Sequence, residues 1–352
     1  MISFIEAINL GHKEGLSANN KSYILGLGVN YPNGADGSTK ELAHLYPDRV
    51  LDTPVSEASA TGMCVGMATM GLNTIAHYGR IEFAMYAFDQ IFTQAAKWDY
   101  MFGGNYNCKF SARINIGRQW GNGPQHTANY NSLLLNTPGL NIFWPSRPSE
   151  AYQFTYLLHN VLSPHISIEH RWLFKTKEEF KNLSNSHIAT AKQYGKSKDN
   201  YIVTYGDGLL EALKIFDYEE FKENISIISL TAFIGEREIN RKLISKLRNS
   251  KNIIFFETGT HQYGLLQAFL GQLFENTHLN SNIQFIAPPF SPVATSPKLN
   301  QEYYPTINNI IRVLNATFAC RLKTKKLEFE DIHLAPEFDF SPFQPSETFF
   351  VD

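Results

Sequence analysis

The sequence predicts an α/β protein of two domains, each built on a mainly parallel sheet flanked by helices. Short apolar runs typical of strands alternate with longer runs typical of helices, which favours parallel strands joined by crossover helices. The 352 residues exceed the usual length of one domain, about 100–200 residues. A polar stretch also interrupts the alternation near its middle, which indicates a boundary between two such units.

In the first half, strands are expected where apolar runs lie between turn residues, at 22–26, 49–52, 110–116, 140–144 and 165–168. Helices are expected where small or apolar residues recur at helical spacing, at 39–45, 58–70, 83–98 and 149–162. Ser38 stands before the first of these helices as a plausible N-cap. Pro54 ends the second strand, because the residue before a proline is restricted.

The polar stretch 175–200 is rich in Lys, Glu, Ser and Asn and is interpreted as containing the interdomain linker. The expected domains are 1–180 and 201–321, with the linker at 181–200 and a tail at 322–352. The second domain is expected to contain strands at 201–205, 225–230, 252–256 and 283–286, and helices at 209–216, 238–247, 265–274 and 309–316. The aromatic end of the tail is expected to pack on the second domain or on a partner.

Composition excludes several classes of protein. Hydrophobic residues make up 43% of the chain, which excludes wholesale disorder, and the net charge of -2 gives no basic field for nucleic acid. No run approaches a membrane span and no secretory signal is visible, so we expect no membrane and a cytoplasmic location. Cys64, Cys108 and Cys320 form no CxxC pair, so neither a disulfide framework nor a bound structural metal is expected.

Two segments of the first half place reactive side chains where a strand ends. Glu57 follows the strand at 49–52 and precedes a helix of small residues, where open α/β sheets bind ligands. A helix-start acid favoured by the helix dipole is the structural alternative. Arg118 and His126 lie in a glycine-punctuated loop after a strand, and such loops often line a site, although a lone histidine is more often structural. Polar residues at the strand ends 168–173 and 255–264 complete the candidate segments.

Five segments in this order resemble the beta subunit of the thiamine-diphosphate-dependent 2-oxoacid dehydrogenases, which is similar to the C-terminal two-thirds of transketolase. The segments are Asp52-Thr53-Pro54-Val55-Ser56-Glu57; Gly62, Gly66, Ala68 and Gly71; Phe83, Ala87, Asp89, Gln90, Ala95, Ala96 and Lys97; Gln125-His126-Thr127; and Pro138-Gly139-Leu140. Each segment alone is weak, whereas five in register over about residues 1–318 are specific. The resemblance implies a pyrimidine-binding domain followed by a transketolase C-terminal-like domain.

The resemblance also implies roles for single residues. Glu57 would hydrogen-bond N1′ of the cofactor pyrimidine and thereby activate the thiazolium carbon. His126 is the expected proton-transfer residue beside the reacting carbon. The pyrimidine would contact Val55, Phe83 and Tyr86 in addition to Glu57. Gly79, Arg118 and Gln125 are the residues expected in the substrate pocket.

The other half of the site is expected on an alpha-type partner. Families of this kind hold the diphosphate and Mg²⁺ through Gly-Asp-Gly followed by Asn-Asn, but no Asn-Asn pair follows Gly206-Asp207-Gly208 at that distance. We therefore interpret this triplet as a strand-to-helix turn. The resemblance further implies a heterotetramer of two alpha-type and two beta-type subunits, a lipoyl-bearing acyltransferase as partner, and a K⁺ site. Ser163 occupies a position that is often acidic in the K⁺ loop.

Departures from the family pattern leave alternatives open. Gly79 and Tyr86 replace the Met and Gln common in relatives, and the loop before His126 is unusual for a pyruvate enzyme. The main hypothesis is a subunit that decarboxylates a 2-oxoacid and transfers the acyl or aldehyde unit. One alternative is a split transketolase-like or acyloin-forming enzyme with a sugar-type acceptor. The other alternative is a non-catalytic scaffold subunit.

Overall fold

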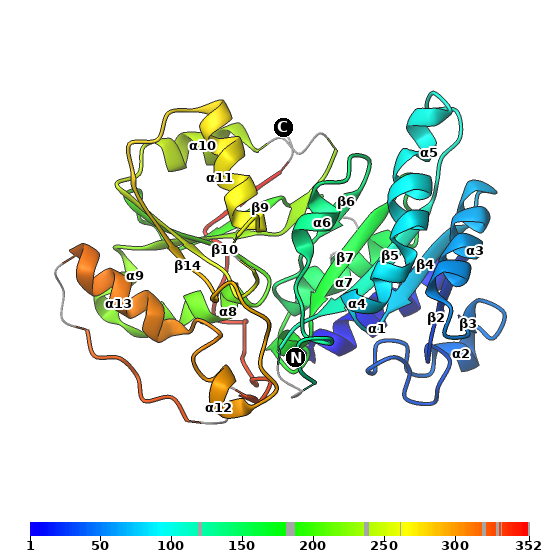
Figure 1. The fold of residues 1–352 in the computed structure, drawn as a ribbon, viewed down its shortest axis with the longest axis horizontal. Helices are drawn as coiled ribbons and strands as arrows, with labels where there is room; N and C mark the ends of the chain where they lie inside the picture. Colours follow the sequence, from blue (N-terminus) through cyan, green and yellow to red (C-terminus); the bar gives the residue numbers. More distant parts are fainter. Residues whose placement is uncertain are drawn as a thin grey trace.

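The computed structural model describes residues 1–118, 122–180, 187–235, 239–260, 262–318, 322–328, 331 and 333–350. These residues form two α/β units that lie side by side, each with a central sheet and helices on both faces (Figure 1). The predicted fold class is confirmed. No helix within the described ranges has the length and apolar character needed to cross a membrane.

The first sheet has seven strands in the order β12-β6-β7-β5-β4-β2-β3. Their bounds are β2 Ser22–Gly26, β3 Val50–Asp52, β4 Asn73–Tyr78, β5 Phe110–Ile116, β6 Asn141–Phe143, β7 His165–His170 and β12 Ala232–Phe233. All neighbouring strands are parallel except β12 and β6. The carboxyl ends of the parallel strands therefore meet at one edge, which is where the loops that carry Glu57 and His126 begin.

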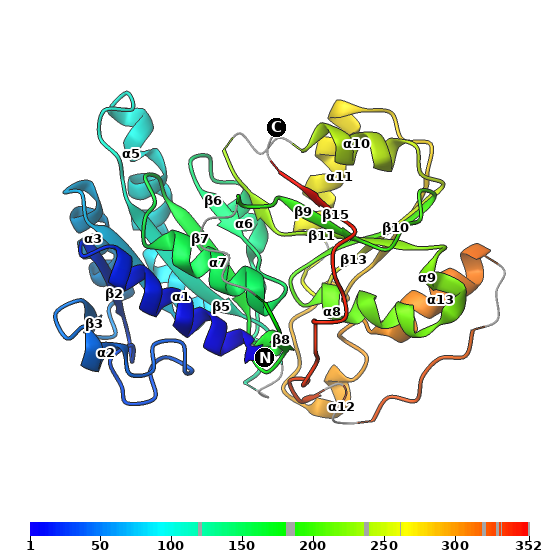
Figure 2. The same cartoon turned by 180° about the vertical axis from the view of Figure 1, so that it is seen from behind.

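Two helices cover one face of this sheet, α1 Phe4–Ala18 and α7 Pro148–Leu158 (Figure 2). A capping box of Ser3 and Glu6 starts α1. The two helices pack closely because Gly15 has no side chain: a Cβ there would lie 2.3 Å from Cδ2 of His159. The sequence analysis did not predict α1 or β4.

The opposite face is covered by α3 Glu57–Thr69 and by the helical stretch 81–101 (Figure 1). This stretch comprises α4 Ile81–Ala84, a 3₁₀ turn Met85–Ala87, a π-helical part Asp89–Ala95 and α5 Ala96–Met101. The predicted helix at 83–98 is thus confirmed as helical. Within its π-helical part, the Thr93 hydroxyl donates to the Asp89 carbonyl at 2.5 Å.

The helix predicted at 39–45 is wrong over its first half, since α2 spans only Leu42–Leu45. Ser38 does not cap it. Its hydroxyl donates to the Ala35 carbonyl at 2.7 Å and accepts from the Arg113 guanidinium at 3.1 Å, so this side chain belongs to a turn. A short α6, Asn131–Leu135, follows the loop that carries His126.

The second sheet has the order β14-β13-β10-β11-β9-β15, with β9 and β15 antiparallel to their neighbours. Its strands are β9 Ala191–Tyr194, β10 Asn200–Tyr205, β11 Ser226–Leu230, β13 Asn252–Phe256, β14 Asn282–Ile286 and β15 Glu347–Phe349. Helices α10 Arg241–Arg248 and α11 Leu265–Asn276 lie on one face (Figure 1). The other face carries α8 Gly208–Leu213, α9 Glu219–Lys222 and α13 Ile307–Phe318. The short α12, Pro297–Asn300, lies in the loop before α13.

Segments from outside the expected second domain also build this sheet. β9 falls within the range predicted as linker, and β15 belongs to the tail and pairs with β9 (Figure 2). Before β15 the tail contacts the first domain, where Arg147 donates to the carbonyls of Phe340 and Phe343. Within the first domain, β8, Lys177–Glu178, pairs antiparallel with β1, Ile2–Ser3. The expected packing of the tail on the second domain is observed.

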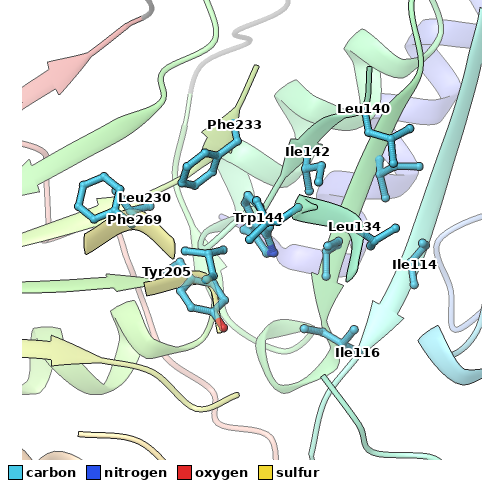
Figure 3. Close-up of a cluster of buried hydrophobic side chains, with 14 of the residues drawn as sticks. Ile114, Ile116, Leu134, Leu140, Ile142, Trp144, Tyr205, Leu230, Phe233 and Phe269 are labelled. Carbon is cyan, nitrogen blue, oxygen red and sulfur yellow. The ribbon is translucent and has the colours of Figure 1, made fainter. Parts of the chain in front are cut away.

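The apolar core continues from one domain into the other (Figure 3). The indole of Trp144, after β6, lies edge-on to the rings of Tyr205 and Phe233, at centroid distances of 6.1 and 5.5 Å. Cys64 and Cys108 are buried and free, and Cys320 lies outside the described residues.

Candidate active site

The first cavity at the carboxyl edge of the first sheet has a volume of about 100 Å³, and we call it the α3 cavity. It is lined by Leu25, Gly26, Leu27, Thr53, Pro54, Glu57, Ala60, Thr61, Cys64, Ala76, His77, Tyr78, Gly79 and Phe83. Its walls are therefore the ends of β2 and β4, the loop after β3 and the first turns of α3. Of the predicted site residues, the structure brings together Glu57, Gly79 and Phe83 here.

The position of Glu57 follows from the local chain. Pro54 accepts a backbone hydrogen bond from Ser56 at 2.7 Å, and this turn leads directly into α3, whose first residue is Glu57. The Thr61 hydroxyl donates to the Glu57 carbonyl at 2.6 Å and contacts the Tyr78 hydroxyl. Burial raises the pKa of Tyr78, so this hydroxyl stays neutral. These contacts hold the first turn of α3, and with it Glu57, against the end of β4.

Asp52 has a structural role at the rim. Its carboxylate accepts a hydrogen bond from the backbone N–H of Gly28 at 2.6 Å. This bond ties the loop after β2 to the end of β3 and so fixes the opening of the α3 cavity.

The sequence analysis missed His77, which lines the α3 cavity from the end of β4. The side chain is buried, and its Nδ1 has no partner among the described residues. Burial, and secondly the Arg113 charge, holds the pKa of His77 well below its usual value, so the imidazole is neutral. Its place at the carboxyl end of a buried strand was the available signal, but the sequence analysis did not predict that strand.

His126 lies directly beside Phe83. Their rings meet edge to face, with centroids 5.7 Å apart and planes at 86°. The loop that carries His126 is held by Glu82, whose carboxylate accepts from the Ala128 N–H at 2.7 Å. The structure therefore joins the predicted proton-transfer residue to the α3 cavity through an aromatic wall.

The remaining predicted residues lie elsewhere. Val55 and Tyr86 are 76% and 74% exposed and do not line the α3 cavity. Arg118 is buried at the boundary between the domains, with its guanidinium 4.1 Å from the ring centroid of Trp172. Its nitrogens lie 3.7 Å from a carboxylate oxygen of Asp207 and 3.8 Å from one of Glu211.

Gln125 lines a second cavity, of about 770 Å³, which we call the interdomain cavity. Its wall from the first domain comprises Glu82 and residues of the loop 124–133, and its wall from the second domain comprises residues of 258–263, 290–293 and 303–304. The polar strand end at 255–264, which the sequence analysis singled out, therefore contributes to this cavity. His261 of that segment lies outside the described residues.

Within the described ranges, no three or more His, Cys, Asp or Glu side chains are grouped to hold a metal ion. The Gly206-Asp207-Gly208 triplet joins β10 to α8, as predicted for a strand-to-helix turn. The Asp207 carboxylate is buried, accepts from the Thr258 hydroxyl at 2.5 Å and lies 3.4 Å from Nε2 of His170. Its partners are therefore groups of this chain at the domain boundary.

Comparisons with known proteins agree with this architecture. Residues 2–175 match the family described as "Transketolase, pyrimidine binding domain". The chain is 30% identical to the pyruvate dehydrogenase E1 component subunit beta-1 of Arabidopsis thaliana over 318 residues, which cover 87% of this chain and 86% of that protein. It is 28% identical to the acetoin:2,6-dichlorophenolindophenol oxidoreductase subunit beta of Cupriavidus necator, over 81% of this chain and 85% of that protein.

Among solved structures, a split-gene transketolase described as an inactive beta4 tetramer superposes with a TM-score of 0.73 and 17% identity. The match covers 91% of this chain and 99% of that chain, and it supports the fold alone. The fold, the matched family model and the relatives thus place the chain in the transketolase-like, thiamine-diphosphate class. Within that class, the chain belongs to the family of beta subunits of the 2-oxoacid dehydrogenases, which confirms the resemblance.

Proposed function

We propose that this chain is the catalytic beta-type subunit of a heteromeric enzyme that decarboxylates a 2-oxoacid and transfers the resulting acyl or aldehyde unit. The observation that carries the proposal is the α3 cavity, where Glu57 and Phe83 line one small space in a member of this family. A scaffold that had lost its chemistry would not need to keep a carboxylate in that cavity.

The described residues fit one half of thiamine diphosphate. A flat aminopyrimidine matches a small cavity with an aromatic wall, a carboxylate and a neutral buried imidazole, that of His77. A diphosphate with its metal has no matching cluster of ligands in the part of the chain that the structure describes. The bound cofactor supplies a carbon nucleophile and an electron sink.

The residues of this chain have separate tasks in the proposal. Glu57 holds a proton at the pyrimidine nitrogen, because a carboxylate next to a ring nitrogen favours its protonated form. Phe83 packs against the ring and fixes its plane. His126, half-buried beside Phe83, moves a proton to or from the substrate at the reacting carbon. Val55 and Tyr86 are exposed outside the α3 cavity and are proposed to contact the cofactor once the partner covers them.

The alpha-type partner is proposed to hold the diphosphate and Mg²⁺ in a heterotetramer of two alpha-type and two beta-type subunits. A lipoyl-bearing acyltransferase is the proposed downstream partner, and the cytoplasm the proposed location. A K⁺ site near Ser163 has less support. The Ser163 carbonyl lies 2.6 Å from Nδ1 of His165 and its hydroxyl accepts from Asn141, so both oxygens are already engaged.

The test is a calorimetric titration of thiamine diphosphate with Mg²⁺, on this chain alone and on the complex with its alpha-type partner. Binding by the complex only is expected, because the described residues provide only the pyrimidine half. Tight binding by the chain alone would contradict the split site, and no binding by either would favour the scaffold alternative.

The matched variant is Glu57→Gln in the complex. We expect its turnover with a 2-oxoacid to fall by about 10²–10⁴-fold, the range for loss of a positioned acid or base. Glu275→Gln, at an exposed position of α11, should leave turnover unchanged and serves as the control. Unchanged activity of Glu57→Gln would refute the proposed mechanism.

A further inference from the structure

The interdomain cavity has no assigned role in the mechanism above. Its volume of about 770 Å³ is within the range of about 300–1,000 Å³ that is common for small-molecule sites, and it lies between two domains, where such sites occur preferentially. It is far larger than the α3 cavity and is lined by both domains.

The cavity borders the reaction centre. Gln125 and Thr127, the two neighbours of His126 in the chain, both line it, and so does Glu82, the neighbour of Phe83. Through these neighbours the interdomain cavity adjoins the edge-to-face pair of His126 and Phe83, and Phe83 also lines the α3 cavity. A molecule in the interdomain cavity would approach the reacting carbon from the side of His126.

The walls combine aromatic rings with hydroxyl and amide groups. The aromatic residues are Tyr130, Tyr263, Phe290, Tyr303 and Tyr304. The uncharged polar residues are Gln125, Thr127, Asn129, Ser132, Thr258, Thr260, Gln262 and Ser291. Among the described lining residues there is no Lys, Arg or His, and the one acid, Glu82, already accepts from the Ala128 N–H. Such walls offer no counter-charge to a phosphate or a carboxylate.

One wall residue has an unmet hydrogen bond. Tyr304 is 7% exposed, and its hydroxyl has no partner among the described residues. Burial raises its pKa, so the hydroxyl stays protonated and remains a donor. A buried donor without a partner is costly, and an oxygen atom of a bound molecule would satisfy it.

We propose that the interdomain cavity binds the acceptor of the acyl or aldehyde unit, that this acceptor is uncharged, and that Tyr304 donates a hydrogen bond to one of its oxygens. This inference rests on the function proposed above and assigns the second domain a part in substrate binding. The shared chemistry is an uncharged carbonyl compound with an apolar body. Its source is either a free aldehyde or ketone, or the amide-linked dithiolane of a lipoyl arm.

The overall reaction balances for both sources. The 2-oxoacid loses its carboxylate as CO₂, and its former carbonyl carbon forms a bond to the carbonyl carbon or to one sulfur of the acceptor. The C=O π bond or the S–S bond of the acceptor breaks, and the freed oxygen or second sulfur takes up one proton. With the dithiolane the donor carbon is oxidised as the disulfide is reduced.

The experiment separates the donor half-reaction from transfer, using the complex with its alpha-type partner and saturating thiamine diphosphate and Mg²⁺. Reduction of the dye 2,6-dichlorophenolindophenol with pyruvate or 2-oxoisovalerate reports the donor half. Transfer is measured with lipoamide against lipoic acid and with glyceraldehyde against glyceraldehyde 3-phosphate. The uncharged member of each pair is expected to have the lower KM, and the pair that reacts identifies the source.

Two variants test the cavity itself. Tyr304→Phe should raise the KM for the uncharged acceptor about 3- to 10-fold, the effect of one hydrogen bond. Leu133→Trp, at a half-exposed position of the wall, should raise it more than about 10-fold by filling the space. Both should keep dye reduction within about 2-fold of the unmodified complex. Tyr100→Phe and Leu162→Trp, at exposed positions outside the cavity, are the matched controls.

If Tyr304 had only a structural role, Tyr304→Phe would lower the thermal midpoint of the complex. Removing a hydroxyl without a partner should leave the thermal midpoint of Tyr304→Phe unchanged or higher, so a raised KM with an intact midpoint supports binding. Unchanged KM in both variants with intact dye reduction would overturn the inference, as would a preference for the charged acceptors. Absence of dye reduction in the unmodified complex would instead overturn the proposed function, and this inference with it.

Discussion

The interiors of the two domains differ in chemistry although their folds are similar. The first domain buries four imidazoles, those of His12, His77, His159 and His170, together with an Arg113–Glu169 ion pair of zero exposure. The second domain buries no imidazole among its described residues, and apart from tyrosines its buried ionisable side chains are the carboxylates of Asp207, Glu211 and Glu257. Similar topology therefore does not determine how the stability of a domain responds to pH or to the loss of a charge, because the buried ionisable groups set that response.

A chain of hydrogen bonds fixes the orientation and protonation of two of the buried histidines in the first domain. An Arg113 guanidinium nitrogen donates to Nε2 of His12 at 2.9 Å, which places the His12 proton on Nδ1. That nitrogen then donates to Nε2 of His159 at 2.9 Å, and Nδ1 of His159 donates to the Ser22 hydroxyl at 2.7 Å. Each imidazole is neutral here, and protonating either would set two donors against each other.

The largest expected effect is acid unfolding of the first domain. Burial lowers the folded-state pKa of all four histidines, to about 3 for His159 and about 4 for His170, while the unfolded value is about 6.5. The contribution of these neutral histidines to the free energy of unfolding is therefore complete above pH 6.5 and is lost as the pH falls toward 4. At pH 5 His159 and His170 each cost about 2 kcal/mol relative to pH 7, so these two alone remove about 4 kcal/mol, a large part of a typical domain stability, and His12 and His77 act in the same direction.

Amide hydrogen exchange, measured separately for each domain between pH 7 and pH 5, checks this expectation. Protection from exchange should be lost in the first sheet before it is lost in the second. His159→Gln should flatten the pH dependence because the new side chain does not titrate. His44→Asn, at an exposed position, should leave it unchanged. Simultaneous loss of protection in both sheets would contradict the comparison.

The second effect is loss of the buried counter-charge in Glu169→Gln. The Arg113 guanidinium donates to both oxygens of Glu169, at 2.7 and 2.5 Å, with both side chains fully buried. Removing the carboxylate leaves a buried cation without its partner, which should lower the free energy of unfolding by about 3–5 kcal/mol in chemical denaturation.

Two variants sharpen this prediction. The exposed pair of Lys177 and Glu337 should be nearly neutral, so Glu337→Gln should cost less than about 1 kcal/mol. The double variant Arg113→Leu/Glu169→Leu removes the unpaired charge, but it also removes the hydrogen bonds that Arg113 donates to His12 and Ser38, so it should recover only part of the loss. A double variant less stable than Glu169→Gln would show that these hydrogen bonds outweigh the cost of the unpaired charge.

Sequence reasoning succeeded where the relevant residues are local or share a strand edge. Parallel strands bring their carboxyl ends together, so Glu57 after β3 and the loop of His126 after β5 could be expected at one edge, whereas Phe83 came from the family resemblance. The family motifs added the identity of the cavity. Strands with continuous apolar runs, such as β5 and β13, were predicted with their observed bounds.

Sequence reasoning failed where the interacting residues are far apart in the chain and the sequence around each of them has no unusual pattern. His12 and His159 are 147 positions apart and each lies in or next to an amphipathic helix, so neither carries a local signal of the network. Arg118 stands in a site-like loop, but its partners on the second domain became visible only in the folded chain. The interdomain cavity depends in the same way on how the two domains pack.

The smallest expected effect concerns the boundary between the two interiors, at Arg118. Its contacts with Asp207 and Glu211, at 3.7 and 3.8 Å, are longer than those of Arg113, and each carboxylate keeps another partner. Asp207 retains Thr258, and Glu211 retains Lys214 at 2.8 Å. Arg118→Met should therefore lower the free energy of unfolding by about 1–3 kcal/mol, less than Glu169→Gln.

The same variant should affect the two cavities unequally. Arg118 lies 5.0 Å from the ring of Tyr304, so its loss should disturb the interdomain cavity, whereas residues of the first domain alone line the α3 cavity. In the complex, acceptor KM should rise while the affinity for thiamine diphosphate stays within about 2-fold, and Arg312→Met, at an exposed position of α13, should change neither. Two results would contradict this prediction: a loss of stability in Arg118→Met equal to that of Glu169→Gln, or a loss of cofactor affinity as large as the rise in acceptor KM. Either result would mean that the domain boundary and the interior of the first domain are thermodynamically coupled.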